Sequence, residues 1–202
     1  SGIGKVAAAC SATMLIERYG VERLVFTGVA GGLHAQARVG DVVVADTLLQ
    51  HDLDASPIFP RHEVPLLGLS RFAADARLSA ELHAAADSAL KNAAWLGDDA
   101  RALGVTEPRL HRGLVISGDR FVATATESQA LRAELPDALA VEMEGAAMAQ
   151  VCHAYGLPLA VLRIISDRAD DSAHVDFSRF IQSVARRMTA AIVQRWLASD
   201  VA

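Results

Sequence analysis

Two short apolar segments in the last third of the chain each end in an acidic residue and then give way to a different pattern. The first covers 139–143 and ends at Glu144, where alanine-rich helical spacing begins. The second covers 159–165 and ends, two residues later, at Asp167. Short apolar runs that alternate with helical spacing are typical of domains in which helices cover a largely parallel sheet. This alternation predicts an α/β fold.

The two acids follow strands that are consecutive along the chain. In open α/β sheets, ligands bind in the crevice beyond the carboxyl ends of the strands. We therefore expect Glu144 and Asp167 to face one pocket. An acid after a strand can also be a helix cap or a solvated turn residue, and spacing alone leaves both interpretations open.

The same alternation runs through the rest of the chain. Further strands are expected at 24–27, 42–49 and 111–117, and further helices at 6–19, 78–94, 127–135 and 176–197, the last with Asp176 as its N-cap. The polar, acidic stretch 97–108 is predicted to be a mobile loop. With 202 residues and no repeat or linker, we expect a single domain with one sizeable core.

The charge balance narrows the range of partners. Lys and Arg number 19 against 24 Asp and Glu, a formal net charge of -5, so there is no basic field to hold a nucleic acid. The longest apolar runs are interrupted well before the roughly 20 residues that span a bilayer, and no signal-peptide pattern opens the chain. We expect a cytoplasmic protein that binds neither nucleic acid nor membrane.

The chain has two cysteines and one cluster of His and Asp residues. Cys10 and Cys152 each fall within apolar helical spacing, and we expect both to be buried core thiols. The nearest approach to a metal motif is 51–54, His-Asp-Leu-Asp, which we interpret as a polar strand end. We therefore expect no metal and no cofactor.

Three loop-like segments bear on ligand binding. Segment 1–5 (SGIGK) precedes a helix as an anion-binding loop would, but Val6 stands where a Walker loop needs Ser or Thr. In 28–32, three glycines among five residues permit a tight turn that can lie against a flat ligand, or an ordinary turn. The proline-rich segment 56–65 is expected to be a partner surface or a lid.

Four strand ends, at Thr27, Ser117, Met143 and Ile165, are expected to meet in one pocket. It would contain a glycine platform, the aromatic ring of Phe121, two or three acids and few bases. Such a pocket suits a neutral or cationic ligand with many hydroxyls better than a phosphorylated one.

Six segments resemble, in order, the 5'-methylthioadenosine/S-adenosylhomocysteine nucleosidases of the purine nucleoside phosphorylase superfamily. They are 1–8 (SGIGKVAA), 27–32 (TGVAGG), 39–43 (VGDVV), 117–119 (SGD), 141–144 (VEME) and 166–167 (SD). The resemblance covers essentially the whole chain. It implies a phosphorylase/hydrolase-like three-layer α/β fold with a mixed, partly barrel-like sheet flanked by helices, one domain over 1–202, and usually a homodimer.

The resemblance also implies the reaction, which is hydrolysis of the N-glycosidic bond with release of adenine and a 5-thio-substituted ribose. Asp167 would protonate N7 of adenine and Ser166 would orient it, so the pocket must favour the protonated form of an acid that is usually ionised at neutral pH. Glu144 would bind the ribose hydroxyls and favour positive charge on the sugar. Met143 would pack against the ribose, and Phe121 would stack on the adenine.

Further positions are implied in the same way. Main-chain groups of Val122 would read the edge of the base, and Ala30 and Gly31 would line the same pocket. Ile3 and Phe177 would surround the 5'-alkylthio group.

Two more pairs complete the set. Phe59 and Pro65 would lie in a loop that reaches the neighbouring subunit's site. Glu142 and Arg163 would be either substrate contacts or structural partners near the site.

The chain departs from the superfamily pattern at two places. Phosphorylases place an arginine and a serine on the glycine loop to hold phosphate, whereas Phe26 and Val29 stand here, which favours water as the acceptor. The nucleosidases usually keep Ser or Thr at the position of Val29. The family's first strand and water-activating glutamate would precede Ser1, so we expect either unrecorded upstream residues or a truncated, poorly active chain.

Three other functions remain open at this point. The chain could hydrolyse another purine nucleoside, of the futalosine type, or it could be a purine nucleoside phosphorylase. A nucleoside-binding protein with impaired catalysis is the alternative from a different class.

Overall fold

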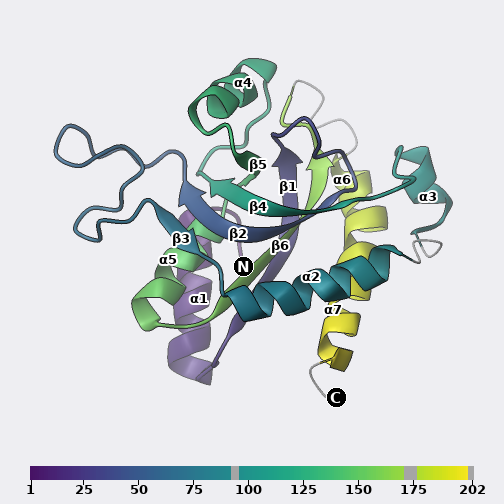
Figure 1. The fold of residues 1–202 in the computed structure, drawn as a ribbon, viewed down its shortest axis with the longest axis horizontal. Coiled ribbons are helices and arrows are strands. Elements are labelled where there is room, and N and C mark those ends of the chain that lie inside the picture. The colour runs from purple at the N-terminus through teal and green to yellow at the C-terminus, as the bar shows by residue number, and fades with distance from the viewer. Residues whose placement is uncertain (92–95, 171–176, 200–202) are drawn as a thin grey trace.

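The computed structural model describes residues 1–91, 96–170 and 177–199 (Figure 1). Its strands are β1 (Leu24–Gly32), β2 (Val42–Gln50), β3 (Arg71–Ala73), β4 (Leu110–Ser117), β5 (Ala138–Glu142) and β6 (Leu159–Asp167). Its helices are α1 (Lys5–Tyr19), α2 (Ala76–Leu90), α3 (Gly97–Ala102), α4 (Ala125–Glu134), α5 (Gly145–Tyr155), α6 (Phe177–Phe180) and α7 (Arg186–Ser199), with a π-helical turn η2 (Ile181–Ala185) between the last two.

The strands form one mixed sheet in the order β3-β2-β4-β5-β1-β6, and β2 also pairs with β6. That extra pairing closes β2, β4, β5, β1 and β6 into a ring, with β3 attached outside it. Pairing is parallel for β1 with β6 and for β4 with β2 and β5, and antiparallel where β1 meets β5 and β2 meets β6. The expected mixed, partly barrel-like sheet is confirmed.

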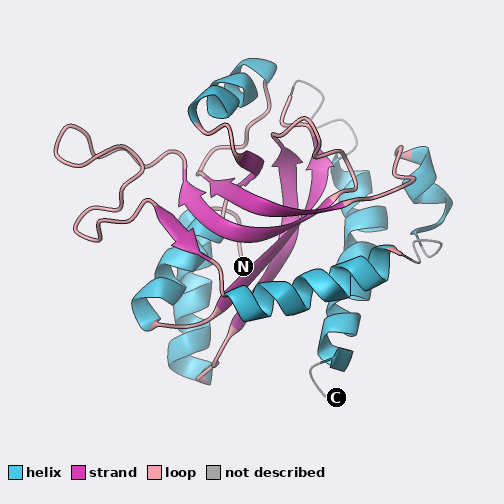
Figure 2. Cartoon of the chain, viewed as in Figure 1, coloured by secondary structure: helices cyan, strands magenta, loops and turns pink. Residues whose placement is uncertain are grey.

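Helices cover both faces of this sheet (Figure 2). Because side chains alternate along a strand, β2 sends Val43 and Ala45 into the core that includes α1 and α5, and Val42 and Val44 into the core that includes α2 and α7. The three-layer arrangement follows directly from this alternation.

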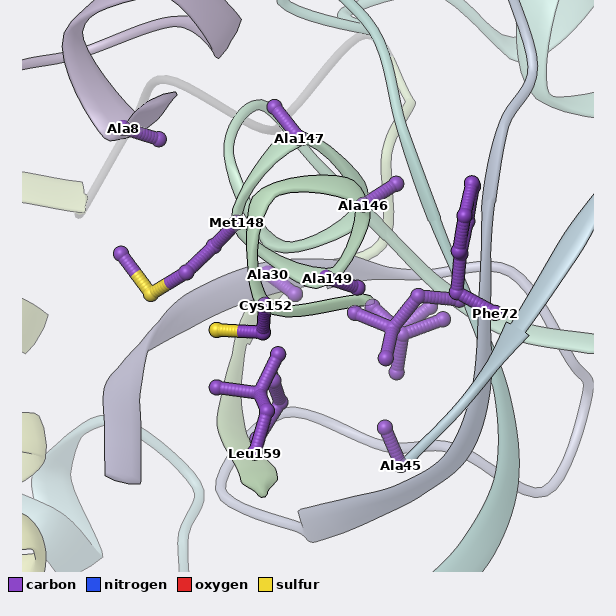
Figure 3. Packing of buried hydrophobic residues seen from close by; sticks show 14 of the residues in the cluster. Ala8, Ala30, Ala45, Phe72, Ala146, Ala147, Met148, Ala149, Cys152 and Leu159 are labelled. Carbon is purple, nitrogen blue, oxygen red and sulfur yellow. The ribbon is translucent and has the colours of Figure 1, made fainter. Parts of the chain in front are cut away.

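Helix α5 lies close to the sheet because its inward side chains are small. Ala146, Ala149 and Cys152 face the strands, and Met148 fills the space toward α1 (Figure 3). Burial raises the pKa of Cys152 to about 11, as expected for a core thiol. The close packing of α5 fixes the position of its N-terminus, which lies at the site described below.

Three predictions about local structure were wrong. The glycine segment 28–32 is not a turn, because β1 continues through it with a bulge between Ala30 and Gly31. Residues 97–108 contain α3, which is held by Ala100 and Val105 in the core rather than forming a mobile loop. Cys10 lies on the exposed side of α1.

The sequence predicts the position of the C-terminal helix correctly, but not its division into shorter elements. It is divided into α6, η2 and α7, and the predicted N-cap Asp176 lies outside the described residues. The three-residue strand β3 was too short to be recognised. Among the described residues, no helix is both long enough and apolar enough to cross a bilayer.

Candidate active site

A cavity of about 640 Å³ opens where the carboxyl ends of β1, β5 and β6 converge. Its walls contain every residue predicted to bind substrate or to act in catalysis within one chain: Ile3, Ala30, Gly31, Phe121, Val122, Glu142, Met143, Glu144, Arg163, Ser166, Asp167 and Phe177. Phe59 and Pro65 lie elsewhere, in the segment between β2 and β3 that projects from the body of the molecule (Figure 1).

The strands meet at Gly31. This residue pairs with Val141 of β5 on one side and with Asp167 of β6 on the other. A side chain at this point would collide with the β6 side, because a Cβ on Gly31 would lie 2.9 Å from Cβ of Ala169 and 3.0 Å from Oδ1 of Asp167. The glycine therefore allows the acid to lie directly against β1.

Asp167 is the last residue of β6 and is only 7% exposed. Oγ of Ser166 donates to its Oδ2 at 2.7 Å, and the N–H of Ala169 donates to its Oδ1 at 2.8 Å. Burial raises the pKa of Asp167 and outweighs these two donors, which would lower it. Burial thus shifts Asp167 toward its protonated form, which is the direction that an acid catalyst requires.

Glu144 lines the same cavity, immediately before α5, and is half-buried. The N–H of Gly4 donates to its Oε1 at 2.9 Å. Burial raises the pKa of Glu144, the Gly4 contact opposes this effect, and the nearby charge of Glu142 adds to it.

Glu142 is held by donors from three elements and therefore acts as an internal anchor. Both of its oxygens accept from the N–H of Gly145 at 2.9 Å, and Ser117 donates its hydroxyl to Oε1. Arg163 donates to Oε2 from Nη2 and, at 3.1 Å, from Nε. This carboxylate satisfies the first N–H groups of α5 and so fixes the adjacent Glu144.

Arg163 is almost wholly buried and fills the space along β1. Its guanidinium carbon lies 4.2 Å from the ring centroid of Phe26, a cation–π contact. A Cβ on Gly28 would lie 2.9 Å from Nη1 of the same guanidinium. The glycine and the aromatic ring on β1 therefore form the slot for this buried cation.

The mouth of the cavity is aromatic. Phe121 and Phe177 make an edge-to-face pair with ring centroids 5.9 Å apart, and Phe121 is 45% exposed. A flat apolar ligand that lies against the free face of Phe121 can cover this exposed ring.

Some lining residues were not predicted to be part of the site. Ile181 reaches the cavity from η2, and its spacing of four residues from Phe177 is the signal that could have identified it. Arg120 and Val141 also line the cavity, each next to a predicted residue.

The His-Asp-Leu-Asp segment follows β2, and one of its acids is paired within the chain. Within 1–91, 96–170 and 177–199, no three His, Cys, Asp or Glu side chains are placed to hold a metal ion. Asp52 instead binds Lys5 at 2.6 Å.

Comparison with known proteins agrees with this geometry. The model of the phosphorylase superfamily matches residues 1–198. The chain belongs to this superfamily. Within it, the chain is 37% identical over 186 residues to the 5'-methylthioadenosine/S-adenosylhomocysteine nucleosidase of Anoxybacillus flavithermus, with 92% of this chain and 73% of the relative covered.

Solved structures of the phosphorylase superfamily share the fold. The nucleosidase of the same name from Neisseria meningitidis, in complex with methylthio-immucillin-A, has a TM-score of 0.82 and 34% identity, covering 98% of this chain and 79% of that one. A futalosine hydrolase mutant from Helicobacter pylori has a TM-score of 0.80 and 31% identity, covering 98% and 78%. These similarities confirm the predicted family and fold class.

Proposed function

We propose that the protein is a nucleosidase, an N-ribosyl hydrolase that cleaves 5'-methylthioadenosine and S-adenosylhomocysteine to adenine and a 5-thio-substituted ribose. The observation that carries the proposal is the placement of Asp167 and Glu144 in the wall of one cavity, where burial raises the pKa of Asp167 in the direction that its acid role requires. The names of the relatives from Anoxybacillus and Neisseria support the choice of substrates.

In this mechanism Asp167 is the general acid. Its proton passes to N7 of adenine, the bond between N9 and C1' breaks, and the bonding electron pair leaves with the base. Loss of those electrons gives C1' oxocarbenium character, and water adds to it and then releases a proton. Ser166 holds the carboxyl group of Asp167 in place during the transfer.

Glu144 holds the sugar. In its ionised form it accepts hydrogen bonds from the ribose hydroxyls, and its negative charge stabilises the positive charge that develops on the ring. Met143 packs against the ribose. Phe121 and the main chain of Val122 bind the base, while Ile3 and Phe177 enclose the 5' substituent.

Water is the proposed acceptor, rather than phosphate. Phe26 and Val29 line the cavity at positions where phosphorylases carry phosphate donors. The buried cation nearest to them, Arg163, is neutralised by Glu142 and covered by Phe26. Arg163 therefore offers no free positive charge to an incoming phosphate.

A futalosine-type hydrolase is the second candidate, because the Helicobacter relative bears that name. Residues 1–202 are proposed to form one nucleoside-phosphorylase-like domain of a cytoplasmic homodimer, in which Phe59 and Pro65 contact the neighbouring subunit. The exposed Ile58 and Leu66 beside them supply apolar surface for such a contact. Sedimentation analysis of wild type and Ile58→Asp would test the dimer.

The decisive experiment is a substrate panel. Methylthioadenosine, S-adenosylhomocysteine, futalosine and inosine would be incubated with the protein, with and without phosphate, and free base would be measured. We expect methylthioadenosine and S-adenosylhomocysteine to release adenine, and each to do so at the same rate with and without phosphate. Strict dependence on phosphate would overturn the hydrolase assignment, and calorimetric binding of methylthioadenosine without adenine release would identify a binding protein.

A further inference from the structure

Asp52 lies just after β2, outside the cavity, yet its carboxylate joins two segments that form cavity walls. Its Oδ1 accepts from Nζ of Lys5 at 2.6 Å, and its Oδ2 accepts from the N–H of Asp119 at 2.8 Å. The two partners also contact each other, because the N–H of Lys5 donates to Oδ1 of Asp119 at 2.7 Å. These three residues form a closed triangle of contacts, which we call the Asp52 triangle.

The Asp52 triangle lies at the base of both walls. Ile3 precedes Lys5 by two residues and lines the cavity. Phe121 follows Asp119 by two residues and also lines the cavity. A displacement of Lys5 or Asp119 would therefore move a cavity wall with it.

The same contacts reach Glu144 through Gly4. Gly4 is the N-cap residue of α1 and has φ +94°, and Asp119 supplies from a distant loop the capping carboxylate that a glycine cannot provide. With Lys5 capped in this way, the preceding N–H points at Oε1 of Glu144 at 2.9 Å. A Cβ on Gly4 would lie 3.1 Å from Oδ1 of Asp119, so the fit is close.

The charges of the triangle are matched. Burial tends to raise the pKa of Asp52, but the hydrogen bonds from Lys5 and Asp119 outweigh it and lower that pKa. Asp52 is therefore ionised at neutral pH and paired with the ammonium group of Lys5. The pair is partly shielded, since the side chains of Lys5 and Asp52 are 16% and 30% exposed.

We propose that Asp52, with Lys5 and Asp119, is a positioning group for the proposed reaction, holding the N–H of Gly4 against Glu144 and the segment 120–122 against the base. The inference rests on the proposed function, since it gives Glu144 its role at the ribose. None of the three residues is assigned a contact with the substrate.

The pH profile distinguishes positioning from a purely structural role. The groups that act on Glu144 are Glu142, which raises its pKa, and Arg163 and the N–H groups of Gly4 and Met143, which lower it. Gly4 makes the largest contribution that opposes burial. Release of Gly4 should therefore raise the pKa of Glu144 further and move the acid limb of kcat/KM to higher pH.

The experiment compares Asp52→Asn, Lys5→Met and the double variant with Lys5→Arg and Asp46→Asn. Asp46 is the matched control, because it lies on β2, the strand that Asp52 follows, and pairs with Arg112 at 2.7 Å but does not line the cavity. Rates of adenine release from methylthioadenosine would be measured between about pH 4 and pH 9. This range covers the titration of carboxyl groups with ordinary and with raised pKa values. Unfolding in urea would be followed for each variant.

We expect Asp52→Asn and Lys5→Met each to raise KM by about tenfold and to move the acid limb upward, with the double variant no worse than either single one because the pair acts as a unit. Lys5→Arg should restore most of the activity, and Asp46→Asn should match wild type. If Asp52→Asn and Lys5→Met fold and keep the wild-type KM and the wild-type acid limb, this inference is overturned while the proposed function stands. A wild-type protein that neither cleaves nor binds a nucleoside would overturn the proposed function, and this inference with it.

Discussion

The guanidinium of Arg163 donates from both Nε and Nη2 to a single oxygen of Glu142, Oε2. The two side chains are 1% and 2% exposed, so the pair is sealed within the cavity wall. Sequence reasoning left open whether these residues contact the substrate or support the site. Their geometry favours support, because Glu142 also holds the N–H of Gly145 at the start of α5.

Removing one partner of this pair should strongly destabilise the fold. Arg163→Met leaves the carboxylate of Glu142 buried without its cation, and we expect a loss of about 3–5 kcal/mol in the free energy of unfolding. Urea denaturation measures it. The control is Asp137→Asn, which breaks an exposed pair with Arg71 and should cost about 0–1 kcal/mol. Equal losses in both variants would contradict the internal anchor.

Asp167→Asn should abolish most turnover while nucleoside binding persists. The amide cannot deliver a proton to N7, and general acid catalysis is worth roughly 10²- to 10⁴-fold in rate. Adenine release and calorimetric titration with methylthioadenosine measure the two effects separately. Ser166→Ala should have a smaller effect of the same kind, because it removes only the hydroxyl that orients the acid. Unchanged turnover in Asp167→Asn would remove this residue from the acid role.

The stability of the protein should depend on pH through Asp167. Its pKa in the folded state is above the ordinary value of 3.8, so as pH rises from 3.8 the unfolded chain loses this proton first. Stability therefore falls across the interval from 3.8 up to the raised pKa, by about 1.4 kcal/mol for each unit of the shift. In Asp167→Asn this fall should be missing, as urea titrations at several pH values would reveal.

Asp54 provides a control, because its pKa is shifted in the direction opposite to that of Asp167. It is fully exposed, and hydrogen bonds from Ser56 lower its pKa. Asp54→Asn should therefore remove a contribution that is present above 3.8 and lost as pH falls. If Asp54→Asn and Asp167→Asn changed the pH dependence in the same direction, the assignment to burial would be wrong.

Gly31→Ala should impair turnover more than it impairs folding. The added methyl group would approach Oδ1 of Asp167 to 3.0 Å and Cβ of Ala169 to 2.9 Å, so the acid must move away from β1. We expect at least a tenfold fall in kcat and a loss of about 1–3 kcal/mol in stability, the usual cost of overpacking. A wild-type kcat with a lowered Tm would show that the backbone of β1 moves and that the side chain of Asp167 stays in place.

The thiol of Cys152 should be inert in the folded protein. It is buried in the core beneath α5, with a pKa of about 11, so almost no reactive thiolate forms at neutral pH. In Cys10→Ser, a chromogenic disulfide reagent should react with no thiol in the native protein and with one thiol in denaturant. Rapid reaction in native buffer would show that α5 separates readily from the sheet.

Much of the site could be predicted because it depends on strand ends. Glu144 and Asp167 were identified from the point at which apolar runs stop, and the parallel pairing of β1 with β6 brings Asp167 beside Gly31. The segment 28–32 was misread because its glycines are required by distant neighbours, Arg163 and Ala169, rather than by a local turn. Such a requirement is invisible along the chain.

Other errors have a similar physical cause. Helix α3 was read as a loop because its anchoring residues, such as Ala100, are few and widely spaced in a polar segment. Cys10 was assigned to the core because the outer side of α1 is also apolar, as exposed Val6 and Met14 show. Periodicity locates a helix, but two apolar sides leave its orientation undetermined.

The closed ring of β2, β4, β5, β1 and β6 decides which parts of the cavity can change size. Each of these strands is paired on both sides, so the floor can widen only if backbone hydrogen bonds break. Ile3, Phe121 and Phe177 instead belong to segments outside the ring. Under the proposed function, 5' substituents of different length would therefore be accommodated by Ile3 and Phe177 rather than by the strands, while Asp167, the last residue of β6, keeps a constant position.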